Sequence, residues 1–224
     1  MIVAIIQARM GSTRLPGKVL KDIGGETMLA RVVRRVQRAT LVDQVVVATT
    51  PKPADDAIIA ECQQLGVEVF RSSELDVLSR YYWAARVYDA KVVARITADC
   101  PLIDSVVIDR VVLAFLREKP DFASNVITRT YPRGLDISVM TMAALTRAYN
   151  KAKKAYDREH VTSYIYQNPK IFKLLSVEGD VDYSNHHWTV DTQEDLDFVR
   201  GIYARLGENV CGGLDAVLQA VGAT

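Results

Sequence analysis

Short apolar runs alternate along much of this chain with longer segments whose apolar positions recur every three or four residues. The run at 2–6 is apolar and mostly β-branched, which is typical of a buried strand. The segment 28–39 instead places its apolar residues on one side and its arginines on the other, which predicts an amphipathic helix. This alternation of strand-like and helix-like segments predicts a mostly parallel sheet with right-handed crossovers and helices on both faces.

The same patterns place the remaining elements. Up to about residue 119 they predict strands at 44–49, 67–70 and 91–97, and helices at 55–65, 76–88 and, capped by Asp104, at 105–119. After Pro120 the pattern is less regular. It predicts short strands at 121–125, 136–140, 172–178 and 185–190, and helices at 141–152, 157–168 and 192–206, the last with a capping box of Thr192 and Asp195.

Composition narrows the possible classes of protein. The chain has 224 residues, 49% of them hydrophobic, which fits one α/β domain over 1–224 with an irregular excursion at about 131–173. The 28 basic and 27 acidic side chains give a net charge of +1, so we expect no nucleic-acid partner and no membrane surface. Three widely spaced cysteines suggest neither a metal site nor a disulfide framework, and we expect a cytoplasmic location.

A basic, glycine-containing loop follows the first strand. Within ten residues it holds Arg9, Arg14 and Lys18, two glycines and the hydroxyls of Ser12 and Thr13. A loop between a buried strand and a helix directs backbone N–H groups and cations at one place, and arginine forks grip phosphate oxygens. The spacing matches neither a Walker loop nor a dinucleotide fingerprint, so we expect another kind of polyphosphate site.

Two aspartates follow predicted strands at the same edge of the sheet. Asp99 comes just after the strand at 91–97, and Asp191 comes just after the strand at 185–190. Parallel strands bring their carboxyl ends to one edge, so both carboxylates are expected beside the basic loop. Two carboxylates facing a polyphosphate are the ligands that Mg²⁺ prefers, and the sequence therefore predicts a magnesium site.

Several motifs of this chain resemble one enzyme superfamily. The stretch from Gln7 to Lys18, QARMGSTRLPGK, closely resembles the nucleotide-binding signature of CMP-KDO synthetases and is similar to that of acylneuraminate cytidylyltransferases. The stretch from Val190 to Leu196, VDTQEDL, resembles their magnesium motif. Three further stretches are similar to the spore-coat-polysaccharide branch of the superfamily: RITADCPLID at 95–104, YPRGLDIS at 131–138 and DREHV at 157–161.

The resemblance implies a three-layer fold like that of nucleotide-diphospho-sugar transferases. It also implies that a sugar hydroxyl attacks the α-phosphorus of CTP and that pyrophosphate leaves, so that CMP is joined to a nonulosonate or KDO-like acid for surface polysaccharide. By the same resemblance, Asp99 and Asp191 would bind Mg²⁺. The residues expected to bind the nucleotide are Gln7, Ala8, Arg9, Gly11, Ser12, Arg14, Lys18 and Thr49, of which Arg9, Arg14 and Lys18 would act in catalysis with the two aspartates.

An acidic sugar needs donors for its carboxylate and hydroxyls. Two polar segments are candidates for its pocket, and they contribute Arg133, Gly134, Asp136, Arg158 and His160. His160 is the best placed of these for proton transfer near neutral pH, or it serves as a structural hydrogen-bonding residue. Related synthetases commonly form homodimers, and we expect the contact within 131–173.

The sequence departs from the family at two positions and leaves other functions open. Cys100 replaces the second acid of CMP-KDO synthetases, and Ser138 stands where the spore-coat branch is expected to carry an acid. One alternative is a glycosyltransferase that uses a nucleotide sugar, and another is a nucleotidyltransferase acting on a sugar 1-phosphate. A third is a non-catalytic nucleotide-binding subunit, which Ser138 would allow.

Overall fold

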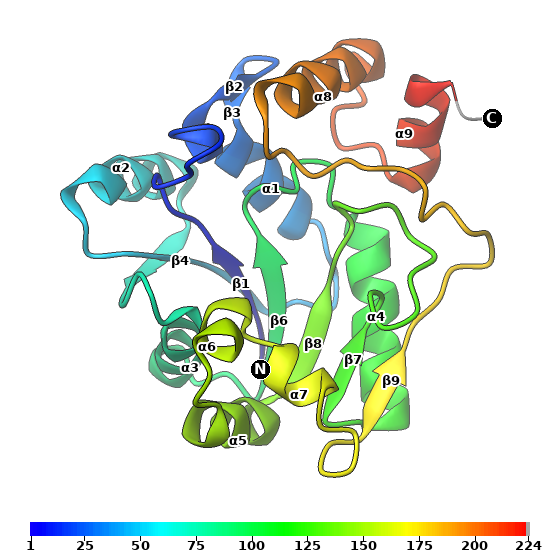
Figure 1. Cartoon of the computed structure of the whole chain (residues 1–224). Coiled ribbons are helices and arrows are strands. Elements are labelled where there is room, and N and C mark those ends of the chain that lie inside the picture. Colours follow the sequence, from blue (N-terminus) through cyan, green and yellow to red (C-terminus); the bar gives the residue numbers. More distant parts are fainter. Residues whose placement is uncertain (223–224) are drawn as a thin grey trace.

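The computed structural model describes residues 1–222 and is built on a seven-stranded sheet (Figure 1). The strand order is β5-β4-β1-β6-β8-β7-β9, and only β8 runs antiparallel to its neighbours. The strands are β1 (Ile2–Gln7), β4 (Gln44–Thr49), β5 (Glu68–Arg71), β6 (Val92–Thr97), β7 (Phe122–Ser124), β8 (Ser138–Thr141) and β9 (Leu174–Ser176). The predicted mostly parallel sheet is thus confirmed.

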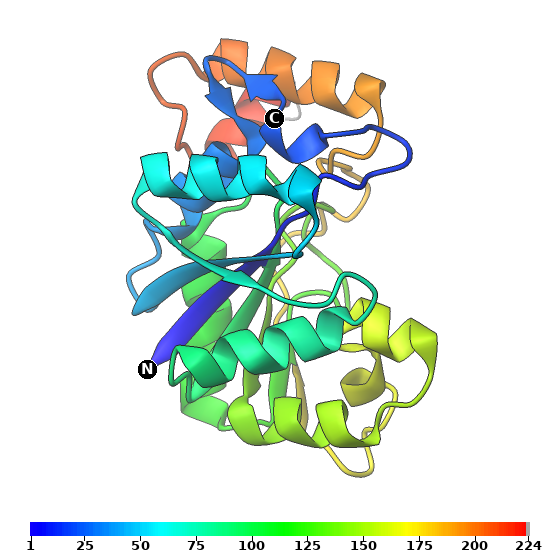
Figure 2. The ribbon, with the colours of Figure 1, turned by 90° about the vertical axis from the view of Figure 1, so that its left-hand side faces the viewer.

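Helices cover both faces of this sheet, so the molecule has three layers (Figure 2). One layer contains α1 (Met28–Val36), α2 (Asp56–Leu65), α4 (Ser105–Glu118), α8 (Gln193–Leu206) and α9 (Leu214–Val221). The other contains α3 (Val77–Val87), α5 (Met142–Lys151), α6 (Ala155–His160) and α7 (Ser163–Tyr166). No helix in residues 1–222 is long and apolar enough to cross a membrane.

The central strand β1 shows why both faces need covering. Ala4 and Ile6 pack with the layer of α1 and α4, whereas Val3 and Ile5 pack with the layer of α3 and α5. All four side chains are fully buried, as expected for a strand whose residues alternate between two helical layers. A small hairpin, β2 (Asp22–Ile23) with β3 (Glu26–Thr27), leads from the basic loop into α1.

Three expectations about elements need correction. The segment 185–190 is not a strand, since it makes only one isolated bridge, between His187 and Arg133. The helix expected at 157–168 is two short helices, because Val161 has a positive φ of 59° that interrupts it. The patterns also missed α9 and the short 3₁₀ helices Lys18–Leu20 and Pro53–Asp55.

The strand order creates a crevice at the carboxyl ends of β1 and β6. The chain leaves β1 toward β4 on one side, and it leaves β6 through α4 toward β7 on the other side. Adjacent parallel strands whose connections diverge in this way leave an opening above their ends, where ligands bind in open α/β sheets. The basic loop follows β1 and Asp99 follows β6, so both border this crevice.

Candidate active site

The basic loop after β1 is fixed by the protein around it. The buried carboxylate of Asp55 accepts hydrogen bonds from the backbone N–H of Met10, at 2.7 Å, and from the hydroxyl of Thr50. The N–H of Gly17 donates to the carbonyl of Met10, and Gly17 has a φ of +66° just before the 3₁₀ turn Lys18–Leu20. Glycine adopts this φ without steric cost, so the turn brings Lys18 back toward the sheet.

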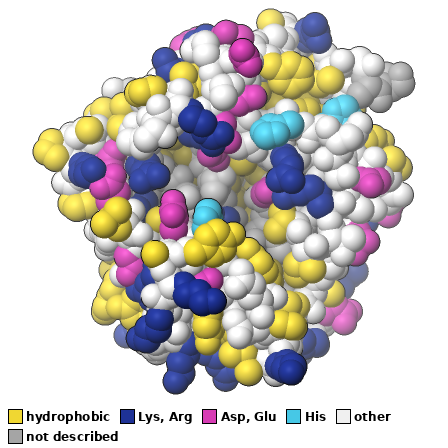
Figure 3. Space-filling model, in the orientation of Figure 1, with side chains coloured by type: hydrophobic (Ala, Val, Ile, Leu, Met, Phe, Trp, Pro, Cys, Tyr) yellow, Lys and Arg dark blue, Asp and Glu magenta, His cyan; other side chains and the backbone are white. Residues whose placement is uncertain are grey.

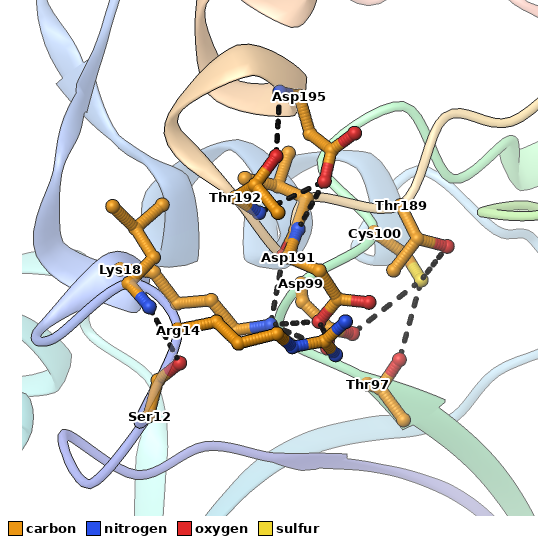
Figure 4. A network of polar contacts seen from close by, with 12 residues as sticks. Ser12, Arg14, Lys18, Thr97, Asp99, Cys100, Thr189, Asp191, Thr192 and Asp195 are labelled. Atoms are coloured by element: carbon orange, nitrogen blue, oxygen red, sulfur yellow. Dashed lines mark hydrogen bonds and ion pairs between the residues drawn. The ribbon is translucent and has the colours of Figure 1, made fainter.

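Lys18 lies between Asp99, which follows β6, and Asp191, which precedes α8 (Figure 4). Its Nζ donates to Asp99 Oδ2 and Asp191 Oδ1, both at 2.9 Å, and to the carbonyl of Val190 at 2.7 Å. Arg14 adds a second cation, 2.9 Å from the same oxygen of Asp191. The sequence predicted that these side chains meet at one edge of the sheet, and the structure brings them together.

The electrostatics of this cluster favour charged side chains on both partners. Burial alone would lower the pKa of Lys18, but the neighbouring carboxylates of Asp99 and Asp191 raise it above its ordinary value. Burial alone would raise the pKa of Asp99, but Lys18 and the hydroxyl of Thr97 hold it below its ordinary value. Lys18 and Asp99 therefore remain an ion pair across the neutral range.

Two backbone interactions keep the aspartates in register. The N–H of Val190 donates to the carbonyl of Asp99 at 2.9 Å, which joins the two loops directly. The carboxylate of Asp195 accepts from the N–H groups of Asp191 and Thr192, at 2.9 and 2.8 Å, while Thr192 caps the N–H of Asp195. The predicted capping box of Thr192 and Asp195 is confirmed, and it also orients the backbone of Asp191.

A cleft of about 520 Å³ opens at these residues between the basic loop, β6 and the helices α3 and α6. Figure 3 shows it as a hollow in the face of the molecule, with lysine and arginine side chains around it. Most of the predicted nucleotide and metal residues line it: Gln7, Ala8, Arg9, Gly11, Ser12, Arg14, Lys18, Asp99 and Asp191. His160 also lines it, together with Glu159.

Five predicted site residues do not line the cleft, and the first two of them are Thr49 and Arg158. Thr49 is fully buried at the end of β4, with no hydrogen-bond partner for its hydroxyl within residues 1–222. Arg158 turns toward α3, where its guanidinium makes a two-pronged pair with Asp76 and donates to the carbonyl of Tyr149 at 2.7 Å. Arg158 therefore joins α6 to the start of α3, and His160 and Glu159 are the residues of this segment that line the cleft.

The other acceptor candidates lie on the β8 side of Asp99, outside the cleft lining. Arg133 is exposed, and its backbone pairs with His186 and Trp188. Asp136 accepts two hydrogen bonds from Arg129, at 2.7 and 2.9 Å. Gly134 has a φ of +107°, and a Cβ there would lie 2.8 Å from the carbonyl carbon of Trp188, so its position requires glycine for packing.

Cys100, which replaces an acid of the related synthetases, is a buried thiol. Burial, reinforced by the nearby carboxylates of Asp99 and Asp136, raises its pKa well above the ordinary value. Its sulfur lies 3.2 Å from the hydroxyl of Thr97 and 3.6 Å from Asp99. A neutral thiol in this position supports the conformation of the Asp99 loop but supplies no charge to a metal or a phosphate.

His160 is directed to the cleft by a strained turn. Val161 is buried with φ 59° and ψ −58°, and the N–H of Thr162 donates back to the carbonyl of His160, which forms a tight γ-turn. A β-branched residue rarely adopts this conformation, and such strain is often found at functional sites. The buried pair of Asp157 with the Ser163 hydroxyl, at 2.6 Å, spans the turn and holds it.

Sequence patterns missed three charged residues that shape the site. Asp55 holds the basic loop, as described above, and Glu74 pairs with Lys52 and lies 3.8 Å from Arg9. Arg80, only 2% exposed, donates to the carbonyls of Ser73 and Glu74 and so fixes the loop before α3. In the sequence each of them is only a charged residue within a segment that becomes largely buried. The amphipathic pattern does not distinguish such a residue from a charged residue on the surface.

The family model described as Cytidylyltransferase matches residues 3–204, most of the chain. The spore coat polysaccharide biosynthesis protein SpsF of Bacillus subtilis is 32% identical over 219 residues, covering 92% of this chain and 88% of that protein.

Solved structures agree with this family. A cytidylyltransferase from Leptospira borgpetersenii aligns with a TM-score of 0.95 and 33% identity, covering 99% of this chain and 94% of that one. The structure of a CMP:2-keto-3-deoxy-manno-octonic acid synthetase complexed with CTP aligns with a TM-score of 0.69 over 91% of this chain and 98% of its own. At 20% identity, the second match shows a shared fold only.

Proposed function

This chain belongs to the cytidylyltransferase family and is a nucleotidyltransferase, and we propose that it transfers CMP from CTP to an acidic sugar with release of pyrophosphate. The observation that carries the proposal is the cluster in which Lys18 joins the carboxylates of Asp99 and Asp191 beside the basic loop. The product would serve surface polysaccharide, as the name of the B. subtilis relative suggests.

The residues fit a divalent metal of the Mg²⁺ type. Asp99 and Asp191 converge on a single cation, the ammonium of Lys18, so a positive charge already occupies the space between them. Within residues 1–222 no group of three or more His, Cys, Asp and Glu side chains gathers as for a metal held wholly by protein. Two carboxylates with room for phosphate oxygens and water are the ligand set that Mg²⁺ takes.

In this proposal Asp99 and Asp191 hold the metal, which when bound neutralises charge on the phosphates. Lys18 and Arg14 stabilise the charge that develops on the phosphates and on the leaving pyrophosphate, and Arg9 grips the triphosphate from the rim of the cleft. Gln7, Ala8, Gly11 and Ser12 form the adjoining wall for the nucleotide. Because phosphoryl-type transfer depends on position and charge, no covalent nucleophile is needed.

The acceptor would enter beside Asp99, with its attacking hydroxyl in line with the leaving pyrophosphate. His160 lines the cleft, and its imidazole is the candidate group to accept that hydroxyl proton. Arg133 and Asp136 remain candidates for the far side of the sugar, and Thr49 and Gly134 would support the site from beneath. For Arg158, the pair with Asp76 would have to open before it could reach a substrate.

Pyrophosphate release tests the proposal. The purified protein with Mg²⁺ is offered CTP, UTP or GTP against a panel of KDO, N-acetylneuraminic, legionaminic and pseudaminic acids. We expect release with CTP and one acid, and none with the other nucleotides. Release from UTP or GTP with a sugar 1-phosphate would instead identify another class of nucleotidyltransferase. CTP binding without release for every acid would favour a non-catalytic subunit.

A glycosyltransferase remains the alternative outside the nucleotidyltransferases. It would release a nucleotide from a nucleotide sugar, and no pyrophosphate would form in any arm of the assay. We further propose that the protein acts in the cytoplasm as a homodimer whose contact lies in 131–173. Light scattering of the wild-type protein checks the dimer, and a monomer at assay concentration would contradict it.

A further inference from the structure

Among the described cations that line the cleft, Arg95 is the one whose guanidinium contacts neither a carboxylate nor a backbone carbonyl. It lies on β6 between Ile5 of β1 and Ser138 of β8, and its side chain lines the cleft floor with Thr97. Within residues 1–222 no carboxylate oxygen lies within the 4.0 Å of an ion pair with its guanidinium. An arginine that is partly buried without a counter-charge is uncommon, because its desolvation is not offset.

The remaining cleft cations are already engaged. Lys18 and Arg14 contact the metal-binding carboxylates, and Arg9 is paired with Glu74. Arg80 is satisfied by backbone carbonyls. Arg95 is therefore the partly buried arginine of the cleft whose charge is not offset by a carboxylate among the described residues and whose donors are not taken up by backbone carbonyls.

The guanidinium of Arg95 is held in place, although the described residues do not accept hydrogen bonds from all of its donors. One of its terminal nitrogens donates to Gln7 Oε1 at 3.2 Å, and its plane lies near the ring of Tyr81, 5.9 Å from the centroid. The hydroxyl of Tyr81 donates to the carbonyls of Ile5 and Ile96, which fixes the ring. The Nε of Arg95 is buried and has no hydrogen-bond partner among the described residues. Apart from the bond to Gln7, the terminal nitrogens make no hydrogen bond to a described residue, and a positioned fork with such free donors suits a planar carboxylate.

We propose that Arg95 binds the carboxylate of the acidic sugar, an inference that rests on the proposed function. The position supports the acceptor rather than the nucleotide phosphates. Arg95 precedes the end of β6, deeper than Thr97, whereas the basic loop, Asp99 and Asp191 lie beyond the strand ends. An acid seated with its carboxylate on Arg95 would extend its hydroxyls toward Asp99 and the phosphates. Arg158, a sequence-level candidate for this task, is held by Asp76.

Kinetics of Arg95→Gln test this assignment, with the acid from the panel that the wild type uses best. We expect the KM for the acid to rise about 10- to 100-fold, since a charge-assisted fork is lost, while the KM for CTP changes by less than about twofold. Calorimetry should show that the variant binds CTP as the wild type does. Arg86→Gln, which removes the same charge from an exposed position of α3, is the matched control and should change neither KM.

A second measurement compares the acid with its methyl ester. The preference for the acid over the ester would not change if Arg95 had only a structural role. The wild type should prefer the acid to the ester by about 10- to 100-fold, and Arg95→Gln should lose most of that preference. If Arg95→Gln does not fold, Arg95→Lys keeps the charge and should show a smaller loss of the same preference.

The outcomes separate this inference from the proposed function. A variant with a raised KM for CTP would assign Arg95 to a nucleotide phosphate and overturn the inference alone. An unchanged preference for acid over ester in a folded variant would overturn it as well. A wild type that releases no pyrophosphate with any acid would overturn the proposed function, and the inference with it.

Discussion

The two sides of Asp99 are built in opposite ways. On the proposed nucleotide side, the basic loop after β1, Asp99 after β6 and Asp191 before α8 form one cluster in which Lys18 contacts both carboxylates at 2.9 Å. On the proposed acceptor side, the predicted residues are divided: His160 lines the cleft, while Arg158 and Asp136 are bound to other protein groups. Most of the first region follows the ends of the parallel strands β1 and β6, whereas the second comes from the connection between β7 and β8 and from the short helix α6.

The difference teaches which kind of site a chain pattern can locate. A strand end has a fixed place in a parallel sheet, so a charged residue that follows it has a predictable position. A residue in an irregular loop is placed by tertiary contacts that its neighbours in sequence do not reveal. The predictions below separate residues that would act on substrates from residues that hold the fold.

The largest effect is expected from the carboxylates that we propose to hold the metal. Asp191→Asn should lower kcat by about 10²- to 10³-fold or more, because it weakens the site for Mg²⁺ and removes charge from beside Lys18. Steady-state pyrophosphate release measures this. Asp197→Asn, an exposed carboxylate on α8, is the control and should leave kcat unchanged. A similar kcat for wild type and Asp191→Asn would remove the aspartate from the mechanism.

A substitution at Gly134 tests the proposed acceptor side, where we expect the residue to support the fold. Gly134→Ala should lower the free energy of unfolding by about 2–4 kcal/mol, because its φ is positive and the new Cβ meets the backbone of Trp188 at 2.8 Å. Gly25→Ala, in the β2–β3 turn, has a positive φ but nothing within 4 Å, and should cost about 1 kcal/mol. Urea unfolding measures both. Equal losses would mean that the contact with Trp188 is not a constraint.

The Lys18 cluster predicts a pH dependence of stability. In the wild type the pKa of Asp99 is held below its ordinary value, so its contribution is present above that value and is lost as pH falls through the depressed pKa. Lys18 has a raised pKa, so its contribution is fully present below its ordinary value and is lost only as pH rises through the raised one.

In Lys18→Met we expect the contribution of Asp99 to stability to change with pH in the opposite direction. Without the ammonium, burial raises the pKa of Asp99, and the free energy of unfolding of the variant should fall as pH rises from 4 to 8. The stability difference from the wild type should therefore widen toward pH 8. For the control Lys151→Met, at the exposed end of α5, the free energy of unfolding should change with pH as it does in the wild type. A constant difference across this range would contradict the coupling.

The smallest effect concerns Arg158. Arg158→Gln should lower the free energy of unfolding by about 1–2 kcal/mol, since it breaks the partly buried pair with Asp76 and the bond to the carbonyl of Tyr149. The KM for the acid should change much less than in Arg95→Gln. A rise in the KM for the acid without loss of stability would show that Arg158 acts on the acceptor and would contradict a purely structural role.

The sequence predicted much of the fold because the regular half of the chain follows simple periodicity. The strand at 44–49 matches β4, and the caps Asp104 and Thr192 begin α4 and α8 as expected. It failed where tertiary contacts decide the backbone. The segment 185–190 has strand-like composition, but it passes over the edge of the sheet, where its backbone pairs with Arg133 and Asp99 in turn instead of with one strand.

The candidate site shows the same division. Gln7, Arg9, Arg14 and Lys18 line one cleft, as expected for residues that end or follow a single strand. Arg95 lies within the motif RITADCPLID, but its neighbours in sequence do not show that, within residues 1–222, its guanidinium has neither a carboxylate partner nor a backbone acceptor. That property depends on segments far apart in the chain that meet only in the folded structure.

The most direct test of the central claim is a ³¹P NMR spectrum of the reaction of wild-type protein with CTP, Mg²⁺ and the accepted acid. CMP transfer predicts that the three CTP signals are replaced by pyrophosphate and one phosphodiester signal in a 1:1 molar ratio of products. Formation of CDP with phosphate, or of pyrophosphate with free CMP, would show hydrolysis and would contradict transfer to an acidic sugar.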